Sequence, residues 1–188
     1  MTWKSHIAIA TAVTIPFNPS ALGVAILGST APDWSEWVLK FFSINVQHRG
    51  ATHYAIVPIS IILFSFLFGD SLAKLGDLIF WFGVGYFTHW FADSLTISGV
   101  PISPWDTSRV HFFGGKLKTG DMLEYIISFS LLAMSVTIAK PMIETVYNFG
   151  TGGEYANTFK VFSMNYEDLN DKNIIDNAEL LEKRFKFF

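Results

Sequence analysis

The sequence predicts an all-α protein, an integral membrane helical bundle with a broken first segment and about three further spans. Hydrophobic residues make up 51% of the 188 residues, and charged residues make up only 15%. Long stretches lack any formal charge, and two prolines interrupt the first of them. A disordered chain needs low hydrophobicity and high net charge, so this composition excludes that class.

The distribution of charge divides the chain into two parts. Residues 1–100 contain nine Asp, Glu, Lys or Arg residues, whereas residues 154–188 contain twelve. We therefore expect a membrane-embedded domain at 1–150 and a polar, partly helical C-terminal tail at 151–188. The net charge of -3 argues against a nucleic-acid-binding protein, which would need a basic surface. Without cysteine, a metal ion would have to be bound by His, Asp or Glu.

The first uncharged stretch covers residues 5–32 and contains Pro16 and Pro19. Proline removes a backbone hydrogen bond from a helix and disfavours helical geometry in the preceding residue. We therefore expect two short helices, at 3–15 and 20–30, folded back on each other. The fold-back would bring the beginning of the chain close to its first Pro-Asp pair. A cleaved signal peptide is the alternative interpretation of this stretch.

Three later apolar stretches predict membrane spans at 54–70, 76–97 and 123–146. A membrane helix needs about 20 mostly apolar residues, and charges at its ends can lie at the interface. Between the spans we expect a polar loop or short helix at 30–53 and a Gly- and Pro-rich loop at 99–122. A soluble helical protein with buried core helices is the alternative.

Titratable side chains inside an apolar body are costly and therefore mark candidate sites. His89 and Asp93 are four residues apart, so a helix places them on one face, where they can bind a cation or simply hydrogen-bond each other. His48, Arg49 and His53 directly precede the second apolar stretch, where the alternative is a polar loop at the membrane surface. Because successive spans run in opposite directions, these groups can meet at one membrane face.

The candidate metal ligands at that face are His6, Asp33, His53, His89, Asp93 and Glu124. Imidazole and carboxylate ligands suit a divalent cation, zinc or alternatively manganese. Lys and Arg are more frequent in the loops on this side than in the single loop opposite, which favours a cytoplasmic location by the positive-inside rule.

The motifs HRGATH, at 48–53, and GYFTHWFADSLTISGVPISPW, at 85–105, resemble the YdjM-like family of predicted LexA-regulated, membrane-bound metal-dependent hydrolases. The elements that carry the resemblance are His6, Pro32-Asp33, His48 to His53, His89 to Asp93, Gly99 to Pro101, and Gly120 to Glu124. The resemblance covers about residues 3–135 and leaves the tail unexplained. It implies a bacterial or phage-encoded inner membrane protein.

The family is distantly similar to zinc-dependent phospholipase C. That similarity implies a metal site formed by Asp33, His53, His89 and Asp93. A second site would use His6, with Asp93 as a bridge, and a third would use Glu124. Those enzymes have a further histidine where this chain has Gly120, and they use a free N-terminal amine, whereas this chain begins five residues before His6. We therefore expect one or two ions.

The resemblance implies hydrolysis by a metal-activated water. Arg49 could bind a phosphate through its forked guanidinium, and His48 could shuttle a proton or orient a metal ligand. A site at the membrane surface favours membrane lipids as partners and a phosphoester in a lipid or lipid-linked molecule as substrate. The alternatives are a non-catalytic scaffold or assembly subunit that retains a metal site, and an ion-coupled transporter.

Overall fold

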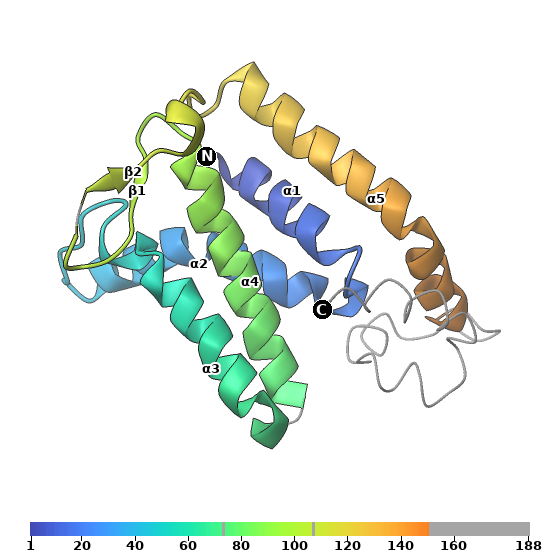
Figure 1. Ribbon diagram of the computed structural model, residues 1–188. Helices are drawn as coiled ribbons and strands as arrows, with labels where there is room; N and C mark the ends of the chain where they lie inside the picture. Colours follow the sequence, from blue (N-terminus) through green and yellow to red (C-terminus); the bar gives the residue numbers. More distant parts are fainter. Residues whose placement is uncertain (73, 107, 151–188) are drawn as a thin grey trace.

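The computed structural model describes residues 1–72, 74–106 and 108–150, and this part of the chain is mostly helical, as the sequence predicts (Figure 1). Its α-helices are α1 (Trp3–Thr14), α2 (Leu22–Phe41), α3 (Ile56–Leu72), α4 (Lys74–Ser94) and α5 (Met122–Gly150). Its shorter elements are the 3₁₀ turns η1 (Pro19–Ala21), η2 (Ala51–His53) and η3 (Phe112–Gly114) and the strands β1 (Val100–Pro101) and β2 (Arg109–Val110). The predicted tail at 151–188 lies outside the described residues.

The first segment is broken where the two prolines predict a break, because α1 ends at Thr14 and α2 begins only after η1. The second helix is longer than predicted. It continues through Pro32 to Phe41, although a loop or short helix was expected from residue 30. Pro32 is fully buried in a helix that packs along α4, and this burial outweighs the lost backbone hydrogen bond. Asp33 therefore lies on a helix and not in a loop.

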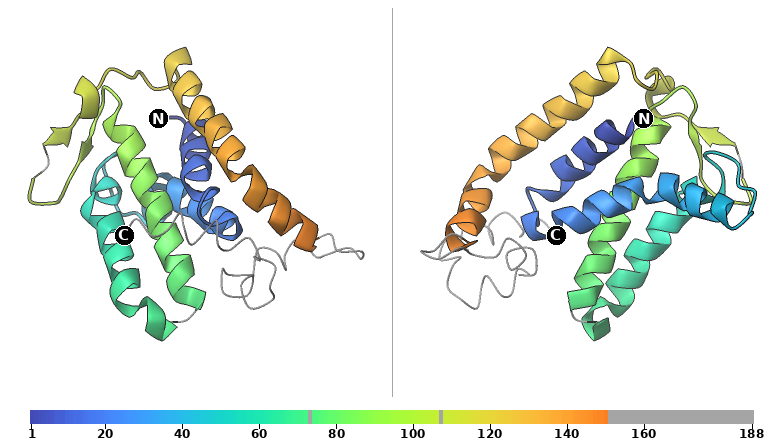
Figure 2. Two further views of the ribbon diagram at one scale, coloured as in Figure 1. Left: turned by 45° about the vertical axis from the view of Figure 1, so that its right-hand side comes forward. Right: turned by 180° about the vertical axis from the view of Figure 1, so that it is seen from behind.

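Helix α4 is the centre of the bundle, with α2 and α3 packed against it, while α1 lies beside α5 (Figures 1 and 2). The crossing of α2 and α4 is close because Gly28 and Gly85 lie in it. A β-carbon built on Gly85 would approach the carbonyl oxygen of Ala25 to 2.0 Å. The N-terminus, the C-terminal end of α4 and the start of α5 gather at one end of the molecule (Figure 1).

The stretch predicted as a loop at 99–122 contains the antiparallel pair β1–β2, with Val100 opposite Val110. The indole N–H of Trp90 donates to the carbonyl of Pro101 at 3.0 Å, and Thr96 forms an isolated bridge with Leu117. These contacts attach the loop to the C-terminal end of α4.

Among the described residues, one helix is long and apolar enough to cross a membrane, over Met122–Lys140 in α5. Only 22% of this stretch is buried, whereas the core helix of a soluble protein is mostly buried. Helix α3 is also apolar but has 17 residues. Its large exposed side chains are Ile56, Ile59, Leu63, Phe64, Phe66, Leu67 and Phe68. The outer faces of α3 and α5 are therefore suited to lipid contact.

Candidate metal centre

Helix α4 contributes His89 and Asp93, which lie one turn apart and are both buried. The Nδ1 atom of His89 donates to the carbonyl oxygen of Ser29 on α2 at 2.7 Å. Because that carbonyl can only accept, it fixes the ring with a proton on Nδ1 and leaves the Nε2 lone pair available. Nε2 lies 3.7 Å from Oδ2 of Asp93.

His53 from η2 and Asp33 from α2 complete a group of four ligand atoms. The Nε2 atom of His53 lies 3.2 Å from Nε2 of His89, 3.5 Å from Oδ1 of Asp33 and 4.0 Å from Oδ2 of Asp93. His89 Nε2 lies 3.9 Å from the same Asp33 oxygen. Zinc bonds of about 2.0–2.1 Å place tetrahedral ligand atoms about 3.3–3.4 Å apart. Asp33, His53 and His89 therefore have a spacing close to that of three ligands of a tetrahedral zinc site, and Oδ2 of Asp93 faces the same two Nε2 atoms.

Asp33 is the half-buried member of this group. Burial by itself would raise the pKa of its carboxyl, but the neighbouring imidazoles of His53 and His89 outweigh burial and lower the pKa to about 2. The side chain is therefore a carboxylate at neutral pH, as a metal ligand must be.

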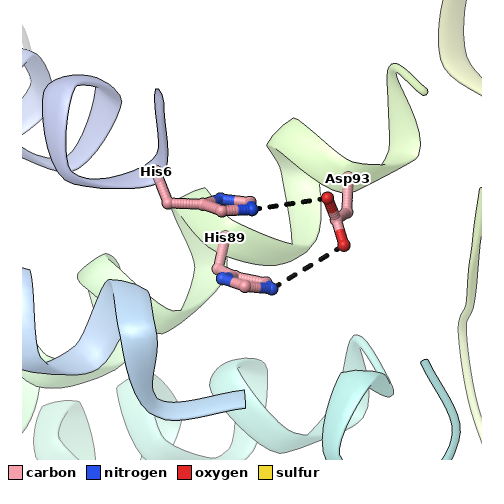
Figure 3. A group of neighbouring side chains, drawn as sticks. All are labelled: His6, His89 and Asp93. Atoms are coloured by element: carbon pink, nitrogen blue, oxygen red, sulfur yellow. Dashed lines mark ion pairs between the residues drawn. The ribbon is translucent and has the colours of Figure 1, made fainter. Parts of the chain in front are cut away.

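His6, from α1, forms a second group with His89 and Asp93. Its ring stacks on that of His89 with centroids 3.7 Å apart (Figure 3). Its Nε2 atom lies 3.4 Å from Oδ1 of Asp93, whereas His89 faces Oδ2. Both His6 ring nitrogens are buried and lack a hydrogen-bond partner among the described residues. Unpaired buried polar atoms are costly, and a cation bound by His6 and Asp93 would remove that cost.

Positive groups surround the Oδ1 atom of Asp93. The Nη2 atom of Arg49 donates to it at 2.9 Å, and Nη1 donates to the hydroxyl of Thr96 at 2.9 Å. The amine of Met1 also donates to this oxygen. Arg49 is therefore buried beside the two groups of possible ligands, and its guanidinium points at Asp93.

Two predicted site residues make other contacts. His48 is exposed, and its Nδ1 atom donates to Oε2 of Glu36 at 2.9 Å. Glu124 is buried and accepts from the backbone N–H groups of Thr2, at 2.7 Å, and Gly120, at 2.9 Å. Among the described residues, Glu124 is in neither group of possible metal ligands and instead binds the start of the chain.

Sequence reasoning overlooked Glu36, a buried carboxylate on α2 that contacts the HRGATH segment. Apart from Asp33, it is the only acidic residue in the first 69 residues, and it follows Asp33 by three positions. A carboxylate three residues from a candidate ligand would lie on the same side of a helix. Because the sequence predicts a loop or short helix from residue 30, it does not predict that Asp33 and Glu36 share one face of a long helix.

The family comparison agrees with the motifs. The family model described as YdjM inner membrane protein matches residues 1–150, which is most of the chain. No curated protein and no solved structure matches the chain, so the similarity to zinc-dependent phospholipase C remains a prediction. The match begins before His6 and ends with α5, so it includes every candidate ligand. The chain therefore belongs to the YdjM inner membrane protein family.

Proposed function

We propose that this protein is a membrane-bound, metal-dependent hydrolase of phosphoester bonds in a lipid or lipid-linked substrate. The observation that carries the proposal is the spacing of Asp33, His53, His89 and Asp93. In a largely buried site, the Nε2 atoms of His53 and His89 lie 3.2 Å from each other and 3.5–4.0 Å from one oxygen of each of the two carboxylates. His6, whose Nε2 atom lies 3.4 Å from the Oδ1 atom of Asp93 and whose ring nitrogens have no hydrogen-bond partner among the described residues, supports a second ion that shares this carboxylate. Zinc fits this set of nitrogens and oxygens best, and manganese is the alternative.

When bound, a divalent ion at this site supplies Lewis acidity and an activated water. Arg49 would bind a phosphoryl oxygen beside Asp93, since a guanidinium has five N–H donors and the contacts with Asp93 and Thr96 leave others available. His48 would exchange protons with solvent, because its ring is exposed and lies beside His53, with centroids 5.8 Å apart. The lipid substrate is inferred from the membrane family and the exposed apolar helices.

The test is turnover by the purified, zinc-loaded protein in mixed micelles with a bacterial phospholipid extract. We expect release of phosphorylated headgroups or inorganic phosphate. Asp93→Asn should lower the rate at least about 100-fold, since even residues that only support a metal ligand contribute about 10- to 100-fold.

The matched control is Asp77→Asn, which makes the same change near the other end of α4, where Asp77 accepts from Asn18. This variant should retain the wild-type rate. Zinc binding without turnover of phosphodiesters or phosphomonoesters would contradict the hydrolase and favour the non-catalytic scaffold that retains a metal site.

We further propose that α3 and α4 cross the membrane together with α5, with the metal centre at the cytoplasmic face. The site lies at the end of α4 from which the HRGATH and β1–β2 loops extend. Those loops contain Arg49, Arg109, Lys116 and Lys118, whereas the opposite end of α4 has Lys74 at the α3–α4 junction.

Cysteine labelling tests this topology, because the chain has no cysteine of its own. In intact spheroplasts, a membrane-impermeant thiol reagent should label Asp70→Cys, near the end of α3, and should not label Lys118→Cys. After cell lysis both variants should be labelled. Equal labelling of both in spheroplasts would contradict the spans, and the reverse pattern would place the site on the periplasmic face.

A further inference from the structure

Glu36 contacts four residues of the HRGATH segment. One oxygen, Oε2, accepts from Nδ1 of His48 at 2.9 Å. The other, Oε1, accepts from the backbone N–H of Arg49 at 3.0 Å and from the hydroxyl of Thr52 at 3.2 Å. The Nδ1 atom of His53 lies 3.2 Å from the same oxygen. The side chain is 6% exposed, so these contacts replace the hydrogen bonds to water that burial removes.

The hydrogen bonds determine which nitrogen of His53 carries the proton. An ionised carboxylate only accepts, and a hydroxyl has a single proton. Because the Thr52 hydroxyl donates that proton to Glu36, it can only accept from Nδ1 of His53, which lies 3.0 Å away. Direct donation from Nδ1 to Glu36 leads to the same tautomer. In either case the Nε2 lone pair of His53 points at His89 and Asp33.

The same argument holds for His89, whose Nδ1 proton is directed to the carbonyl of Ser29. Two Nε2 lone pairs then face each other across 3.2 Å, an arrangement that is unfavourable unless a cation lies between them. Glu36 thus fixes the tautomer of one of these two imidazoles, that of His53.

Glu36 also acts on the backbone. Arg49 has a left-handed conformation, with φ of 57°, which is strained for a non-glycine residue. The hydrogen bond from its N–H to Glu36 stabilises that turn. The turn directs the guanidinium toward Asp93, whose Oδ1 atom lies 2.9 Å from Nη2.

We propose that Glu36 is the positioning residue of the metal centre: it holds His48, Arg49 and His53 as one unit and keeps the Nε2 atom of His53 available for the ion. The inference rests on the proposed metal site. A carboxylate hydrogen-bonded to the far nitrogen of a metal-binding histidine orients the ring and increases its basicity.

The first experiment measures zinc affinity of the full chain in detergent by competition with a chromogenic chelator. Glu36→Gln should weaken zinc binding about 10- to 100-fold, the usual effect of losing such a partner. Glu36→Met, which has a similar volume but no acceptor, should weaken it further. Asp77→Asn, the same change of charge away from the site, should bind zinc with wild-type affinity. Unchanged affinity in both Glu36 variants would overturn the proposal.

The second experiment does not need the metal. Nitrogen NMR of isotope-labelled histidine in chelator-treated protein should show His53 with its proton on Nδ1 in the wild type and a mixture of tautomers in Glu36→Gln. A wild-type ring protonated at Nε2 would overturn the role of Glu36, even if the variant fails to fold. If the wild type binds no zinc, the proposed function fails, and the tautomer still decides the role of Glu36.

Discussion

Replacing His89 with asparagine should reduce bound zinc to below about 0.1 ion per chain, because a tetrahedral site that loses one of its ligands no longer retains the ion through purification. His89 belongs to both groups of possible ligands, so whichever group binds the ion loses a ligand. Asparagine can still donate to the carbonyl of Ser29, and it removes only the Nε2 ligand. The measurement is zinc content after purification and equilibration with zinc.

The His89→Asn variant should also lose its thermal response to the ion. Added zinc should raise the melting temperature of the wild-type protein, because a ligand that binds only the folded state stabilises it, and should leave the variant unchanged. His111→Ala, which removes an exposed histidine in the 95–121 loop, is the control and should keep the wild-type zinc content. Full zinc occupancy in His89→Asn would place the ion elsewhere in the protein.

Replacing Gly85 with alanine should destabilise the protein by about 1–3 kcal/mol, the usual cost of overpacking a core. The new β-carbon would lie 2.0 Å from the carbonyl oxygen of Ala25, and at the same crossing Gly28 already approaches the backbone of Phe82 closely. Backbone atoms cannot rotate away, so α2 and α4 must separate. This cost exceeds the gain of about 1 kcal/mol that alanine brings to a helix interior. Denaturation of the detergent-solubilised protein, followed by circular dichroism, measures the change.

The same substitution should weaken zinc binding. Helix α2 contributes Asp33 and α4 contributes His89 and Asp93, so separating the two helices moves ligands away from a common centre. Gly69→Ala is the matched control, because a β-carbon there meets its nearest neighbour, the Ser65 hydroxyl, at an ordinary distance of 3.6 Å. It should keep both stability and zinc affinity. If Gly85→Ala behaves like Gly69→Ala, the close crossing does not determine the geometry of the site.

Features that depend only on residues close together in the sequence could be predicted from it. The break near Pro16 and Pro19 follows from the geometry of the proline ring. The shared face of His89 and Asp93 follows from the period of the helix. The family could be recognised because its motifs occur in a specific order, and the family match over residues 1–150 agrees with that reading.

Features that depend on packing could not be predicted. Pro32 lies inside a helix because its burial outweighs its local cost, and this places both Asp33 and Glu36 on α2. Glu124 has the residue type and the position of a ligand, yet its oxygens accept from the backbone of Thr2 and Gly120. Neither outcome can be predicted from residue spacing, because each depends on how parts of the chain that are far apart in the sequence pack together.

The sequence alone determined that this chain is helical, poor in charge, and supplied with a small set of imidazole and carboxylate groups in an otherwise apolar body. Composition and local periodicity suffice for that, because each apolar helix needs only its own residues. Only the tertiary structure decided which groups meet: His6, Asp33, His53, His89 and Asp93 converge, while Glu36 contacts the Nδ1 side of His53. Convergence depends on how closely α2 and α4 cross, and that distance is set by glycine-to-backbone contacts between residues far apart in the chain.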